Sequence, residues 1–174
     1  MTTRGATPMP AESEAGGELW DFSLAFYARP RVAEALLALQ DEGGRDVNLI
    51  LYALWHGVSG RGPLDRRALA RAERLSRGLA RRLAAPLRAL RRRLKADSAA
   101  DVQAFRERVK ELELAAEKLA QYRLAALAPM PQRGLARAER LAAGADNLAL
   151  CLGPVAAGSA EAAALRRALA AAVL

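Results

Sequence analysis

One stretch of sequence decides the fold class: residues 64–95 read LDRRALARAERLSRGLARRLAAPLRALRRRLK. Its apolar residues return every three or four positions, a spacing that places them on one face of an α-helix. The stripe consists of Ala68, Ala72, Leu75, Leu79, Leu83, Leu87, Leu90 and Leu94. We predict one long helix that starts after Pro63, with Asp65 as a possible N-cap. The helix is expected to kink at Pro86, which lacks an N–H group and crowds the carbonyl of Arg82. Two helices that meet near Gly78 are the alternative.

A second helical pattern follows directly. Ser98 and Asp101 form a variant of the capping box, which predicts a helix start at this point. Beyond it, apolar residues recur at the heptad spacing of a coiled-coil seam: Val102, Phe105, Val109, Leu112, Ala116 and Leu119. The short turn between the two patterns predicts a long antiparallel hairpin, about 64–95 and 99–127. A seam left uncovered within one chain would favour a homo-oligomer.

Helical patterns also fill the rest of the chain. Three segments, 19–28, 31–42 and 47–58, contain six of the eight aromatic residues. The third, with Asp46 as its predicted N-cap, has two apolar faces, so we expect it to be central and mostly buried. Further helices are predicted from about Leu135 to Leu152, and from the cap Ser159 to Val173. We find no β-strand pattern.

The predicted fold is therefore all-α, a bundle of six to seven helices. We expect residues 1–17 to be a disordered leader and residues 18–174 to be a single domain. That domain comprises an aromatic three-helix unit (18–58), the hairpin (64–127) and C-terminal helices (135–174).

Composition excludes several classes of protein. The 174 residues carry a net charge of +8 and contain one Cys and one His. An internal disulfide, a Cys-based zinc cage and a His-pair metal site are therefore excluded. No uninterrupted run of about 20 apolar residues is present, so no membrane span is expected. Since no signal-peptide core is found either, we predict a cytoplasmic protein. We identify no catalytic, cofactor-binding or metal-binding residues.

Basic residues concentrate in the hairpin: residues 61–95 contain 13 of them against Asp65 and Glu73. The candidate partner-binding residues are Arg81, Arg88, Arg91, Arg92, Arg93 and Lys95. Acidic residues between 101 and 117 could instead pair with this face within the hairpin. Binding of nucleic acid or of an anionic surface through 81–95 is the weaker alternative, because no aromatic residue lies among the arginines to stack on a base.

The aromatic third offers a second candidate site. Its large side chains are expected to form the main core, and they could also line a pocket. The candidate pocket residues are Trp20, Asp21, Tyr27, Asp46, Asn48, Tyr52, Trp55 and His56. A catalytic role for His56 requires a partner that no spacing demonstrates, so we lean against an enzyme.

Several motifs support a family resemblance. They are LWDFSLAFYARP (19–30), DVNLILYALW (46–55), PLRALRRRLK (86–95) and RVKELELAAE (108–117). The chain resembles a family of small, uncharacterised proteobacterial proteins described only as a domain of unknown function. That resemblance implies no activity and transfers no catalytic residues. We therefore predict a non-catalytic helical adaptor or regulator that binds a protein partner. The alternatives are nucleic-acid or anionic-surface binding, and a small-ligand binder or enzyme at the aromatic pocket.

Overall fold

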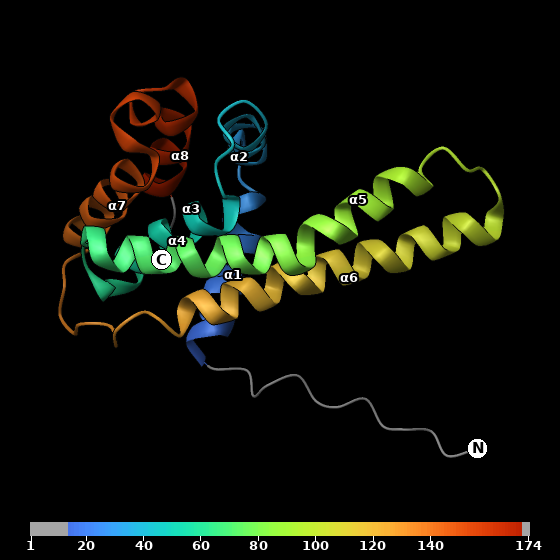
Figure 1. Cartoon of the computed structure of the whole chain (residues 1–174). Helices are drawn as coiled ribbons and strands as arrows, with labels where there is room; N and C mark the ends of the chain where they lie inside the picture. The colour runs from blue at the N-terminus through green and yellow to red at the C-terminus, as the bar shows by residue number, and fades with distance from the viewer. Residues whose placement is uncertain (1–13, 172–174) are drawn as a thin grey trace, which may run out of the picture.

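The computed structural model describes residues 14–171, and every regular element in that range is a helix (Figure 1). The helices are α1 (Glu14–Tyr27), α2 (Val32–Asp41), α3 (Val47–His56), α4 (Arg66–Leu79), α5 (Ala85–Leu94), α6 (Ala100–Ala125), α7 (Arg137–Ala157) and α8 (Ala160–Ala170), with π-helical turns η1 (Gly57–Arg61) and η2 (Ala80–Ala84). Since η2 joins α4 and α5 into one rod, seven helical rods make up the described residues. The prediction of an all-α bundle is confirmed. No helix within 14–171 is both long and apolar enough to cross a membrane.

The predicted hairpin is present. The rod formed by α4, η2 and α5 lies antiparallel to α6, and the outer half of this hairpin extends away from the other helices (Figure 1). The rod widens into η2 just before Pro86, where the N–H of Ala85 donates to the carbonyl of Ala80. A π-turn is one of the ways in which a helix accommodates an interruption of its hydrogen-bond ladder. The interruption expected at Pro86 is thus spread over the preceding turn.

Helix α3 is central and buried, as predicted. All eight residues from Leu49 to His56 are buried, and α3 contacts α1, α2, α4, α6 and α7. Its C-terminal end approaches α7 so closely that a Cβ atom added at Gly57 would overlap the backbone at Gly144. This contact explains why two glycines face each other inside helical segments.

The N-terminal boundary differs from the prediction. Residues 1–13 of the expected leader lie outside the described residues, but Glu14–Gly17 form the first turn of α1. Gly16 is buried there, and a Cβ atom at this position would overlap the ring of Tyr122 on α6. Gly16, which the prediction assigned to the disordered leader, therefore allows a close contact between α1 and α6.

Three of the predicted helix caps are confirmed and one is wrong. The side chains of Asp46, Asp65 and Ser159 accept hydrogen bonds from the first turns of α3, α4 and α8. By contrast, α6 has Ala99 at its N-cap position, so Ser98 lies one residue too early.

The heptad seam of α6 is buried only in part. Val109 is covered by the hairpin, whereas Phe105 is 53% exposed and Leu112 is 57% exposed. Helix α5 packs along one side of α6 only, so the outer heptad positions find no partner among the described residues. Part of the predicted seam is therefore uncovered within one chain, which is the case that the sequence analysis linked to a homo-oligomer.

Candidate partner-binding groove

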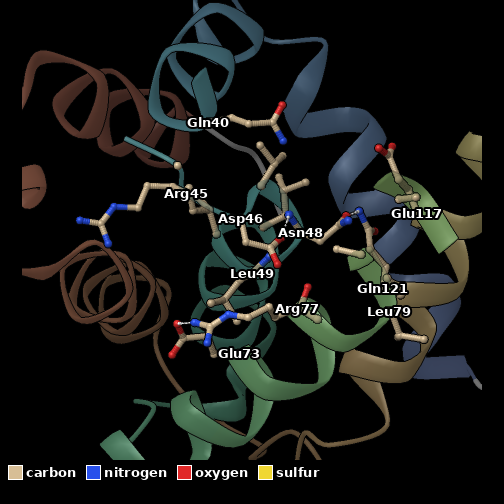
Figure 2. A pocket seen from close by; sticks show the side chains of 18 of the residues that line it. Gln40, Arg45, Asp46, Asn48, Leu49, Glu73, Arg77, Leu79, Glu117 and Gln121 are labelled. Carbon is tan, nitrogen blue, oxygen red and sulfur yellow. Dashed lines mark hydrogen bonds and ion pairs between the residues drawn. The ribbon is translucent and has the colours of Figure 1, made fainter. Parts of the chain in front are cut away.

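A groove of about 1210 Å³ lies between the aromatic helices and the hairpin (Figure 2). Its walls come from α1, the end of α2, the turn before α3, the first half of α3, the rod α4–η2–α5, the middle of α6, and α7 near Gly153. Small-molecule pockets mostly enclose about 300–1,000 Å³. The groove is therefore large enough for a segment of another chain.

Polar side chains from α3 and α6 meet in the lining of the groove. The Asp46 carboxylate accepts hydrogen bonds from the N–H groups of Asn48 (3.0 Å) and Leu49 (3.2 Å). Asn48 and Gln121 point toward one another in Figure 2, and Gln121 Nε2 donates to Asn48 Oδ1 at 3.0 Å. Gln121 Oε1 is buried and accepts no hydrogen bond from the residues that the structure describes. These contacts fix the start of α3 against α6.

Two of the candidate arginines are paired inside the hairpin. Arg88 Nε donates to Glu113 Oε1 at 2.8 Å and Arg88 Nη2 donates to Glu117 Oε1 at 2.9 Å. Arg91 Nε donates to Glu113 Oε2 at 2.6 Å. Glu113 is thus held between two guanidinium groups while it is only 7% exposed. The charges of Arg88 and Arg91 are matched within the chain, which was one of the two expectations for this face.

The surroundings of the two carboxylates shift their pKa values in opposite directions. Burial raises the pKa of Glu113, but the hydrogen bonds and charges of Arg91 and Arg88 outweigh it, and the net pKa lies below the ordinary value. For Glu117, burial dominates and the pKa is raised, although Arg88 opposes the shift. As the pH falls, Glu117 is therefore protonated before Glu113, which keeps its negative charge to lower pH.

Three further arginines line the groove without such partners. Arg45, Arg81 and Arg92 form no ion pair with any residue in 14–171, and the buried Nε of Arg45 makes no hydrogen bond there. Arg93 and Lys95 are exposed but do not line the groove. The candidate basic set is thus divided into paired arginines, groove arginines without an ion pair, and residues outside the groove.

Apolar side chains along the same groove are exposed to solvent. Leu24 and Leu37 are each about half exposed, Leu114 is 53% exposed, and Val155 is 90% exposed. Single exposed apolar residues are common on protein surfaces, but several along one concave surface are typical of an interaction site. The groove therefore combines apolar contacts with positive charge.

The structure divides the candidate pocket residues. Trp20, Tyr27, Asp46 and Asn48 line the groove, whereas Asp21 is exposed on α1 outside it. The remaining three point into the core and do not line the groove: Tyr52, Trp55 and His56. They lie on the C-terminal half of α3, which is surrounded by other helices, while only its N-terminal half reaches the groove.

His56 makes structural contacts. Its Nδ1 lies 3.0 Å from the carbonyl oxygen of Gly62, and its ring packs edge-on against Tyr52. Burial lowers the pKa of the imidazole.

Burial also raises the pKa of the Cys151 thiol to about 12, so this groove residue is a neutral thiol at physiological pH. Among the described residues, no three His, Cys, Asp or Glu side chains gather to hold a metal ion.

Several polar residues with buried or groove-lining roles were not identified from the sequence. Arg45 and Gln121 line it, and Asn147 of α7 accepts from the Leu64 N–H (2.6 Å) and donates to the Gly62 carbonyl (3.1 Å). The available signal was weak: Gln121 and Asn147 are single polar residues within apolar helical stripes.

Arg61 was counted in the basic stretch, but the structure places it at a buried position. Its guanidinium group is buried over the Trp55 ring, 4.1 Å from the ring centroid, and pairs with Glu18.

Comparison with known proteins gives one family match. The family model described as "Protein of unknown function (DUF2390)" matches residues 18–124, which include α2 to α5 and most of α1 and α6. The match confirms the predicted resemblance to a domain of unknown function. Neither the curated proteins nor the solved structures give a match to this chain.

Proposed function

Because the chain belongs to the DUF2390 family of proteins of unknown function, we propose a function from the groove itself: a non-catalytic adaptor that binds a protein partner. The partner segment that fits the groove is an amphipathic helix with acidic residues on one side. The observation that carries the proposal is the meeting of two candidate sets, one from the aromatic helices and one from the basic rod, along one groove.

Charge complementarity supports an acidic occupant. Arg45, Arg81 and Arg92 have no ion pair within residues 14–171, so carboxylates of a partner can pair with them without breaking an existing bridge. Arg88 and Arg91 are different, because a ligand anion would have to compete with Glu113. An acidic segment is therefore expected to contact the groove chiefly through the first three arginines.

The exposed apolar side chains support a helix rather than an extended anion. Leu24 and Leu37 project from α1 and α2, and Leu114 projects from α6 on the hairpin. An amphipathic helix placed between these walls would bury its apolar residues against them, as in other helix-in-groove complexes. Burial of leucine surface provides affinity, and the arginines provide orientation.

Nucleic acid fits the groove less well. Two of the six candidate basic residues, Arg88 and Arg91, are neutralised by Glu113 and Glu117, which lowers the positive field that a phosphate backbone requires. Asp46 and Glu73 add negative charge to the same lining. In the crosslinking experiment described next, capture of nucleic acid by the groove would contradict the proposal.

Site-specific photo-crosslinking in the native cell tests this proposal. A photoreactive amino acid at Leu37 or Leu114 should crosslink to the same protein, whereas one at the exposed Arg123, which does not line the groove, should not. The crosslinked segment, identified by mass spectrometry, should be acidic and amphipathic.

A matched pair of variants completes the experiment. Replacement of Arg45, Arg81 and Arg92 by Ser should reduce the crosslink at least about tenfold, a loss of about 1.4 kcal/mol in binding. Arg93→Ser, outside the groove, should leave it unchanged. Crosslinks to nucleic acid, to a basic segment, or to nothing from either groove position would overturn the proposal.

A further inference from the structure

The outer face of α6 is a second surface that the groove does not use. Phe105 and Leu112 project from it seven residues apart, each more than half exposed, and Ala104 and Ala115 beside them are also exposed. Residues seven apart lie on nearly the same side of a helix, about 10 Å from each other. The face is therefore an apolar strip on the part of the hairpin that extends from the body (Figure 1).

Two charged residues lie between the large apolar side chains. Arg108 and Glu111 are exposed, and neither forms an ion pair with a residue in 14–171. Glu107 instead forms the nearby ion pairs within α6, with Arg106 and Lys110. The strip thus carries one positive and one negative side chain, three residues apart, both available to a partner.

This pattern is complementary to itself. When two copies of α6 lie antiparallel about a two-fold axis near residues 109–110, Arg108 of each copy is opposite Glu111 of the other. The same register places Ala104 opposite Ala115, and Phe105 of one copy beside Leu112 and Ala115 of the other. A two-fold interface requires such self-complementarity, because one patch must match itself.

We propose that a second copy of this chain packs on the outer face of α6, and that the protein forms an antiparallel dimer through the Phe105–Leu112 strip. This proposal is independent of the groove, which opens on the other side of α6 through Leu114 and Glu117. The contact spans only about three helical turns, so it falls in the class of small interfaces. We expect a dimer that dissociates on dilution, with a dissociation constant in the micromolar range.

Exchange of the two charges tests both the dimer and its register. Analytical ultracentrifugation of the full chain should show wild-type dimer at high concentration. Arg108→Glu and Glu111→Arg should each be monomeric, because each places two like charges opposite one another. A mixture of the two variants should form a heterodimer, and the double variant R108E/E111R should dimerise again.

Two further variants keep the result interpretable. Phe105→Ser should abolish the dimer while circular dichroism shows an unchanged helix content. Arg93→Glu, an exposed charge change on α5, should leave the dimer intact. A monomeric wild-type chain at about 500 µM, far above the expected constant, would overturn the proposal. So would a dimer that persists in Phe105→Ser, or the failure of the mixed charge variants to associate.

Discussion

Around α3, every side chain from Leu49 to His56 is buried, whereas α5 in the outer hairpin has no buried residue. The matching part of α6 contributes only Val109 and Glu113 to the buried set. In the body, helices are held by apolar burial. In the outer hairpin, the apolar side chains of α5 are only partly buried, and Arg88 and Arg91 form ion pairs with Glu113 and Glu117 of α6. The two regions should therefore respond differently to the same kind of substitution.

The largest expected effect is the loss of a core side chain from the body. Leu54→Ala removes a fully buried leucine from α3 and should lower the free energy of unfolding by about 2–5 kcal/mol. Leu90→Ala is the matched change in α5, where the side chain is only half-buried, and should cost about 1 kcal/mol. Urea denaturation followed by circular dichroism measures both. Equal losses would contradict the contrast between body and hairpin.

The second effect concerns the charge cluster of the hairpin. Glu113→Gln leaves Arg88 and Arg91 without their shared carboxylate and should cost about 2 kcal/mol, since charged hydrogen bonds are lost at a nearly buried position. We expect faster amide hydrogen exchange in α5 and the first half of α6, and little change in α3. Glu42→Gln, an exposed position without an ion pair in residues 14–171, is the control and should alter stability by less than about 0.5 kcal/mol. If amide hydrogen exchange became faster to the same extent in all helices, the outer hairpin would not be a separate unit of local unfolding.

A smaller effect compares the two aspartate caps. Asp46 accepts hydrogen bonds from two N–H groups at the start of α3, and Asp65 accepts one at the start of α4. Asp46→Ala should cost about 1–2 kcal/mol and Asp65→Ala about 0.5–1 kcal/mol, the usual range for a lost N-cap. Thermal unfolding of the two variants measures the difference. A larger loss at Asp65 would place the more important cap in the hairpin.

Much of the fold followed from local patterns. The leucine stripe of residues 64–95, the aspartate caps and the Pro86 interruption depend on periodicity and backbone chemistry within a few residues, and the structure confirms them. Local patterns were less informative where the partner lies far along the chain. Gly16 was assigned to the disordered leader, because its contact with Tyr122 spans more than 100 residues of sequence and leaves no local pattern.

The groove shows the same limit. Both candidate sets were identified as separate sites, but only the packing of the hairpin against α1 and α3 places Trp20, Asn48 and Arg92 along one surface. Which arginines are paired also depends on that packing, because Arg88 and Glu113 belong to different helices of the hairpin. The sequence predicted the possibility of pairing, while the choice of partners required the register between α5 and α6.

The smallest expected effect tests whether water is excluded from the buried core around α3. Burial, together with the charge of Arg61, lowers the pKa of His56 below its ordinary 6.5, although the hydrogen bond to Gly62 opposes the shift. The unfolded chain therefore binds a proton near pH 6.5 that the folded chain does not. The stability that depends on neutral His56 is complete above pH 6.5 and declines as the pH falls toward the folded pKa, by at most about 1.4 kcal/mol per pH unit.

Because the chain contains one histidine, a single imidazole signal in the NMR spectrum reports this pKa directly. We expect its midpoint below pH 6.5, and His56→Gln should remove the corresponding decline in unfolding free energy between pH 6.5 and the midpoint. A midpoint at or above 6.5 would mean that water or an anion reaches His56. In that case α3 would be open at its C-terminal end, and the distinction between a dry body and a charge-paired hairpin would have to be restricted to the segment from Leu49 to Trp55.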